Sequence, residues 1–212
     1  MSTNIFIYLE PLRHGTWIFE GERIKNVDYD PEDPGVEPEY GPAPLFLGAN
    51  PPLHYLFGLP IDTVLEGPSP PFGRRGLPHD ISAELGQWAT AEAWSRVHGW
   101  VTVRELDAFD WNAVTEVRMV VKRKYIRAYR DSVENSVVSD MAIDWSDRES
   151  RRSLRGVARR DLPSLAPDVF ADITWRPTYA DMAGYNFMEE VVQALGRRYG
   201  PSDLARIIYW FD

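Results

Sequence analysis

The sequence predicts an α+β fold with a small central sheet, several helices packed on it and a long proline-rich loop insertion. Residues 3–9 and 205–211 place β-branched and aromatic side chains on both alternating faces, which is typical of strands buried on both sides. Residues 31–78 hold 12 of the 17 prolines, which deny the backbone donors that helices and sheets need. We expect one domain over residues 1–212, with residues 28–72 as a proline-rich loop region inside it.

The strands come first in this prediction. Because two doubly buried strands stand at opposite ends of the chain, we expect residues 3–9 and 205–211 to be neighbours in one sheet. A third short strand is expected at 15–19, around Trp17. Within the proline-rich loop we expect at most short helical turns near residues 45–49 and 53–59.

The helices are expected in the second half of the chain. A capping box at 102–105 predicts a short helix to about Trp111. Valines and aromatic residues over 114–131 have helical spacing, although a pair of strands remains open there. A second capping box opens a basic helix over 146–161, and the strongest apolar stripe predicts a helix over 182–199, which Gly-Pro ends.

The composition excludes several functions. The 212 residues carry 32 acidic and 23 basic side chains and no cysteine, so disulfides, thiolate metal sites and a cysteine nucleophile are excluded. The net charge of −9 disfavours general nucleic-acid binding. Charge is also uneven, with a net −8 over residues 1–70 and a net +6 over residues 118–160. Without an apolar run of 18 residues or a signal-peptide pattern, we expect a soluble cytoplasmic protein.

Known catalytic and cofactor motifs are missing from the sequence. It has no Gly-x-Gly-x-x-Gly fingerprint, phosphate loop, Gly-x-Ser-x-Gly elbow or His-Glu-x-x-His pair. Zinc sites usually include a closely spaced pair of ligands, and the four histidines are scattered. We therefore expect no metal and no cofactor.

The motifs at residues 4–10, 75–82, 98–111 and 199–212 resemble, in the same order, those of a widespread family of small phage and prophage proteins. Residues 4–10 are similar to that family's opening, which runs Met-Gly-Cys-Asp-Ile-His, then an apolar residue, Tyr, Val and Glu. Residues 75–82 resemble its Arg-Gly-Leu-Pro-x-Asp-x-Ser segment, and residues 98–111 its His-Ser-Trp-Leu-Thr, Glu-Leu and Asp-Trp run. Residues 199–212 are similar to its closing Val-Arg-Ile-Val-Phe-Trp-Phe-Asp-Asn strand.

This resemblance implies a viral accessory protein that works in the cytoplasm of an infected bacterial host. The family has no settled activity, so it supplies context and no mechanism. Where its members carry Cys, Asp and His near the start, this chain has Thr3, Asn4 and Phe6. A polar site built from those groups is in doubt here, which favours binding over catalysis.

A glycine–arginine loop at residues 73–76 is the first candidate ligand site. Glycine lets backbone N–H groups approach an anion, and arginine clamps phosphate with a planar fork, so Arg74, Arg75 and Gly76 are candidate ligands. The alternative is that Arg75 pairs with Asp80 and only staples the loop. His79 lies in the same loop and joins the candidate set.

His98 and Trp100 are the second candidates, because they precede the capped helix whose N-terminus would attract an anion. The alternative is a buried His98 hydrogen-bonded to the backbone, with Trp100 in the core. Trp88 and Trp94 are the expected surface tryptophans, on which a nucleobase could stack.

The predicted ligand-binding set therefore comprises arginine, glycine, histidine and tryptophan residues: Arg74, Arg75, Gly76, His79, Trp88, Trp94, His98 and Trp100. The first hypothesis is a homo-oligomeric protein that sequesters a small phosphorylated nucleotide without turnover, such as a cyclic nucleotide or ADP-ribose derivative used as a bacterial immune signal. The second is a nucleotide or phosphoester hydrolase that uses His98 with Asp80 or Asp110. The third is a protein-binding inhibitor that acts through the acidic proline-rich loop.

Overall fold

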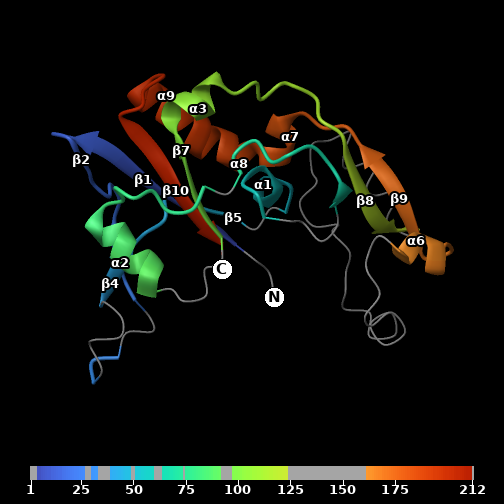
Figure 1. Cartoon of the computed structure of the whole chain (residues 1–212), viewed down its shortest axis with the longest axis horizontal. Helices are drawn as coiled ribbons and strands as arrows, with labels where there is room; N and C mark the ends of the chain where they lie inside the picture. The colour runs from blue at the N-terminus through green and yellow to red at the C-terminus, as the bar shows by residue number, and fades with distance from the viewer. Residues whose placement is uncertain are drawn as a thin grey trace.

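The structure is a computed structural model that describes the chain in eight stretches: residues 4–26, 30–32, 39–48, 51–59, 64–73, 75–91, 97–123 and 161–211. It has the α+β architecture that the sequence predicts, with a central antiparallel sheet and helices on both of its faces (Figure 1).

The two ends of the chain pair with each other, as predicted. β1 (Ile5–Arg13) runs antiparallel to β10 (Ala205–Phe211), with Ile5 opposite Phe211 and Pro11 opposite Ala205. On its other edge β10 pairs with β7 (Val97–Thr102), a strand that the sequence analysis missed. β1 also pairs with β2 (Thr16–Trp17) and β5 (Phe46–Gly48), which completes the sheet.

One face of this sheet, here called the core face, holds the larger hydrophobic core. Ile7, Ile207 and Val101 are fully buried on it, and helical residues pack against them. The helices that contribute buried side chains are α1 (Pro51–Leu56), α3 (Val103–Ala108), α7 (Tyr179–Ala183), α8 (Tyr185–Phe187), the π-helix η3 (Met188–Gln193) and α9 (Ala194–Tyr199).

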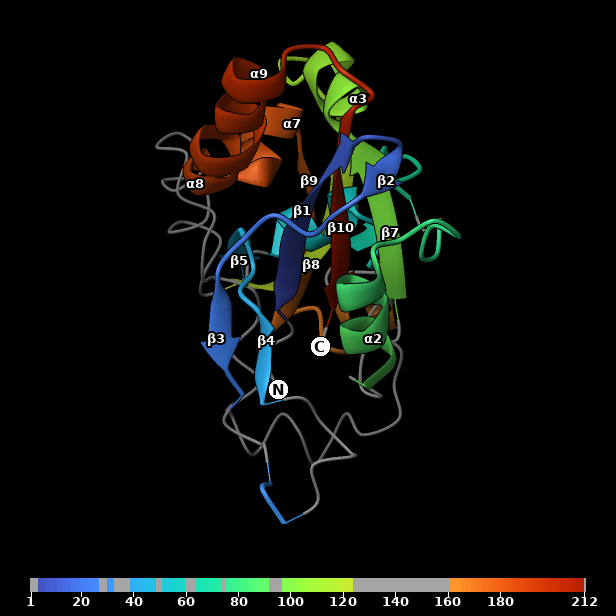
Figure 2. The ribbon, with the colours of Figure 1, turned by 90° about the vertical axis from the view of Figure 1, so that its left-hand side faces the viewer.

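The opposite face, here called the α2 face, carries a smaller core under α2 (Ala83–Ala91). Tyr8 stacks on Trp210 with ring centroids 4.2 Å apart, and Leu85 of α2 is fully buried against this cluster. In Figures 1 and 2, α2 lies on one side of the strands and the helices α7, α8 and α9 lie on the other. The strands are therefore apolar on both faces because both faces are covered.

Two smaller sheets complete the described part. β8 (Val117–Lys122) lies between β6 (Val64–Glu66) and β9 (Phe170–Trp175), next to the short helix α6 (Leu162–Leu165). A two-stranded ribbon of β3 (Arg23–Lys25) and β4 (Tyr40–Pro42) lies beside α2 (Figure 2).

Several element predictions need correction. The helix expected over 114–131 is wrong in the described part of that segment, because residues 117–122 form β8 and pair along their whole length with β9. A strand here agrees with the alternative prediction of a pair of strands. The helix expected over 182–199 is interrupted at Gly184, whose φ of 81° turns the chain between α7 and α8. Residues 46–48 form a strand where a helical turn was expected, while α1 occupies part of the second expected turn. Most of the basic helix expected over 146–161 lies outside the described residues.

Candidate functional site

The loop of residues 75–82 lies on the α2 face, held by side chains from distant parts of the chain. Asp80 accepts a hydrogen bond from Arg206 of β10 at 2.7 Å. Glu10 of β1 accepts one from the backbone N–H of Ser82 at 2.8 Å. The loop that carries Arg75, Gly76 and His79 of the predicted ligand set is therefore tied to both terminal strands.

Arg206 is the buried centre of these ties. The sheet register places it between Glu10 of β1 and Thr102 of β7, with its side chain 3% exposed and that of Glu10 fully buried. Its guanidinium donates to the Glu10 carboxylate at 2.9 Å and to the Asp80 carbonyl at 3.1 Å. Both charges are thus compensated inside the protein, as buried ions must be.

Indole and guanidinium groups alternate across this part of the α2 face. The Arg206 guanidinium carbon lies 4.0 Å from the ring centroid of Trp17 and 5.9 Å from that of Trp100. The guanidinium carbon of Arg75 lies 5.1 Å from the Trp100 centroid. These distances are those of cation–π contacts. They link the four groups through successive cation–π contacts in the sequence Trp17, Arg206, Trp100, Arg75, here called the Arg–Trp stack.

Arg75 is the exposed end of the Arg–Trp stack and faces Glu105 of α3. Its two terminal nitrogens lie 3.0 Å and 2.7 Å from the two carboxylate oxygens of Glu105, and the side chains are 35% and 38% exposed. The alternative pairing of Arg75 with Asp80 is wrong, because Asp80 is taken by Arg206 and by the Trp17 indole N–H at 2.8 Å. The bond to Glu105 raises the pKa of Arg75, which stays a cation.

Glu105 also caps the N-terminus of α3. Its carboxylate accepts from the backbone N–H of Thr102 at 2.8 Å, and the Thr102 hydroxyl accepts from the Glu105 N–H at 3.1 Å. This is the predicted capping box. Burial raises the pKa of Glu105, but the hydrogen bonds from Arg75 and Thr102 outweigh it and leave that pKa below its usual value. The amide groups expected to attract an anion beside His98 are thus partly engaged by the protein itself.

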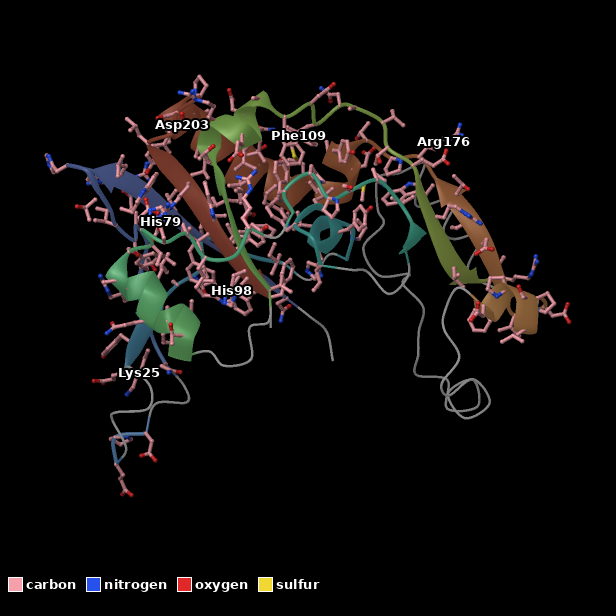
Figure 3. All side chains as sticks on the ribbon, viewed as in Figure 1. Lys25, His79, His98, Phe109, Arg176 and Asp203 are labelled. Carbon is pink, nitrogen blue, oxygen red and sulfur yellow. The ribbon has the colours of Figure 1, made fainter. Side chains whose placement is uncertain are left out.

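The backbone beside Arg75 is open to approach. Gly76 is exposed and has a φ of 70°. Apart from Gly76 and its two chain neighbours, no described residue has a heavy atom within 4 Å of the position that its Cβ would take. His79 is exposed in the same loop and lies near the start of α2 (Figure 3). Arg75, Gly76 and His79 therefore share one accessible loop, while Arg74 lies outside the described residues.

The remaining predicted residues occupy other positions. Trp88 is half-buried on α2, and its ring fills the space where Gly41 of β4 would carry a Cβ, so it packs the β3–β4 ribbon onto α2. Trp94 lies outside the described residues. Trp100 is half-buried, with Arg75 against its ring.

His98 lies on the α2 face but is separated from the loop along the strand β7. It lies opposite Trp210, four residues along β7 from Thr102, whose partner Arg206 binds Asp80. At about 3.3 Å per residue, His98 is roughly 13 Å along β7 from Thr102, and no hydrogen bond joins His98 to Asp80 among the described residues. Figure 3 likewise shows His79 and His98 apart along the strands. The His98 Nε2 atom is buried and has no hydrogen-bond partner in the described stretches of the chain, and burial lowers the pKa of the ring.

Sequence reasoning missed the two residues that organise the site, Glu10 and Arg206. The signal was present, because Arg206 is the single charged residue of the predicted strand 205–211 and Glu10 directly follows the predicted strand 3–9. Charged side chains are almost never fully buried unless they are paired, so opposite charges in two strands expected to be neighbours predict an ion pair.

The described residues contain no group of three or more side chains that could hold a metal ion. In the same part of the chain, no helix is long and apolar enough to span a membrane. Comparison with protein-family models, curated proteins and solved structures finds no match to this chain. The function is therefore inferred from the geometry of the loop of residues 75–82 and the Arg–Trp stack.

Proposed function

We propose that this protein binds a small phosphorylated nucleotide at the exposed end of the Arg–Trp stack and holds it without turnover. The observation that carries the proposal is the position of Arg75, backed by Trp100 on one side, 35% exposed, and followed by the open backbone of Gly76. Nucleobases stack on guanidinium planes, and guanidinium N–H groups bind phosphate.

Arg75 keeps donors for such a ligand. A guanidinium has five N–H donors, and its bonds to Glu105 involve its two terminal nitrogens. The described part of the chain supplies no further hydrogen-bond acceptor for Arg75. A base stacked on its outer face would extend the alternation of the Arg–Trp stack, with the phosphate close to Gly76 and the exposed His79.

The contacts of the candidate acid–base residues, Asp80 and His98, favour binding over hydrolysis. Asp80 is engaged by Arg206 and Trp17, and the sheet register separates it from His98. The protein-binding alternative depends on the acidic loop, of which only residues 30–32 and 39–42 are described between residues 27 and 42. Taken with the sequence resemblance, the proposal is a homo-oligomeric phage protein that captures a nucleotide signal in the cytoplasm of its bacterial host.

The test is calorimetric titration with cyclic AMP, cyclic di-AMP and ADP-ribose, followed by chromatography of the recovered nucleotide and native mass spectrometry of the complex. We expect at least one of the three to bind and to be recovered intact. Arg75→Ala should weaken binding at least tenfold, whereas Arg176→Ala should not change it, because Arg176 forms an exposed pair with Glu116 at the other end of the molecule (Figure 3).

Three outcomes overturn the proposal. If none of the nucleotides binds, or if Arg75→Ala leaves every affinity unchanged, the site assignment is wrong. If a bound nucleotide is recovered with altered mass, the protein is an enzyme. Native mass spectrometry also counts the subunits, so a monomeric complex would remove the homo-oligomer from the proposal.

A further inference from the structure

Among the described residues, the site that we assign to the nucleotide contains three carboxylates and two guanidinium groups. Its two guanidinium groups, Arg75 and Arg206, are each paired with carboxylates, and the three carboxylates involved are Glu10, Asp80 and Glu105. Glu10 is fully buried beneath Arg206, so its charge is already neutralised inside the protein. The Asp80 and Glu105 side chains are 44% and 38% exposed, so their charges face an incoming ligand.

Glu105 is the carboxylate in direct contact with Arg75, whose guanidinium would bind the phosphate. One of its oxygens lies 2.7 Å from Arg75, the group that would hold the phosphate. The capping box fixes it there, because its carboxylate also binds the N–H and hydroxyl of Thr102 at 2.8 Å and 3.0 Å. The carboxylate therefore cannot swing away without uncapping α3, and it stays beside Arg75 when a ligand binds.

A fixed carboxylate penalises ligands according to their charge. A phosphodiester carries one negative charge, whereas a terminal phosphate carries about 1.5 to 2 at pH 7. Repulsion from a half-exposed neighbour is screened but not abolished at a few ångströms. The penalty is therefore larger for a terminal phosphate than for a phosphodiester.

We propose that Glu105 is a specificity-determining residue that makes the site select nucleotides whose phosphates are all esterified, such as cyclic nucleotides and ADP-ribose, over nucleotides with a terminal phosphate. This inference rests on the proposed function. It deepens it by naming the class of phosphorylated ligand that the same site accepts.

The experiment compares matched pairs of ligands on the full chain: cyclic AMP with AMP, cyclic di-AMP with linear pApA, and ADP-ribose with ADP. The members of each pair share the same adenosine units and differ in whether the terminal phosphate is esterified; in ADP-ribose the esterifying group is a second ribose. Wild type should prefer the esterified member of the pair it binds. Glu105→Gln should raise the affinity for the terminal phosphate about three- to tenfold more than for the esterified ligand.

Glu105→Gln is chosen because glutamine also completes a capping box, so α3 keeps its start. The matched control is Glu116→Gln, which removes the same charge from another exposed ion pair with arginine and should leave both affinities unchanged. A second measurement needs no variant: raising the salt from 50 mM to 500 mM screens Glu105, so the preference of wild type within each pair should narrow.

The outcomes separate this inference from the proposed function. If a nucleotide binds through Arg75 but Glu105→Gln changes both members of a pair equally, Glu105 sets no specificity and only this inference fails. Equal wild-type affinity for both members has the same meaning. If no member of any pair binds wild type or the variant, the proposed function fails, and this inference fails with it.

Discussion

Replacing Arg206 by methionine tests the buried ion pair on which the site geometry depends. Methionine keeps much of the apolar stem but removes the guanidinium, which donates three hydrogen bonds to Glu10 and the Asp80 segment at 2.7 to 3.1 Å. Glu10 would then be left charged and without its cation at a fully buried position.

The magnitude follows from that burial. Breaking a buried pair by removing one partner costs about 3–5 kcal/mol, because an uncompensated charge stays inside the protein. Total stabilities of about 5–15 kcal/mol make this a large fraction of the folding free energy. For a chain of this size the same loss lowers the melting temperature by roughly 6–20 °C.

The assay is urea unfolding followed by tryptophan fluorescence and circular dichroism, for Arg206→Met, Glu10→Met and the double variant. Because replacing both partners of a buried pair by apolar groups is often neutral, the double variant should be more stable than Arg206→Met alone. A loss below about 1 kcal/mol in Arg206→Met, or a double variant that loses the sum of the two single losses, would refute the reasoning.

Three further predictions concern the same sheet. Gly99→Ala should cost about 1–3 kcal/mol in thermal unfolding, because its Cβ would overlap the ring and hydroxyl of Tyr209; an unchanged melting temperature contradicts this packing. Burial lowers the pKa of His98, so the unfolded chain takes up a proton on this ring more readily than the folded protein, and stability falls as the pH drops below about 6.5. In wild type the urea midpoint should therefore be lower at pH 5.5 than at pH 7.5, and His98→Phe should reduce this difference. A difference that is the same in the variant would contradict the role of His98. The hydrogen bond from Arg206 lowers the pKa of Asp80, so its contribution is present above about pH 3.9 and is lost as the pH falls further; Asp80→Asn should flatten this acid loss in stability, and an equally steep loss would show that other carboxylates cause it.

The terminal strands could be predicted from the sequence because their pattern has one explanation. Side chains that are apolar on both alternating faces require cover on both faces, and β1 and β10 have it. The capping box at Thr102 and Glu105 was equally specific, since its residue types satisfy two particular backbone donors. These predictions depend on residues that are close together in the sequence, and no contact with a distant part of the chain changes their outcome.

The rest of the fold depends on partners that the sequence does not place. The valines of β8 have helical spacing as well as strand propensity, and the pairing with β9 decides between them. The same holds at the site, where Arg75 had Asp80 as a nearby candidate partner in the sequence. The structure gives it Glu105, 30 residues away, because β7 and α3 bring that carboxylate onto the α2 face.

The tie between Arg206, Glu10 and Asp80 explains how this loop can present a ligand site without regular structure of its own. Its anchors come from the first strand, the last strand and the loop, separated by 196 and 126 residues in the chain. A loop held at such distant points keeps its shape only when the terminal strands are paired, so the exposed end of the Arg–Trp stack is assembled by the whole sheet. A variant that frays β10 should therefore lose the proposed nucleotide binding before it loses the helices of the core face. Following both signals in one urea titration distinguishes this order from a single concerted loss.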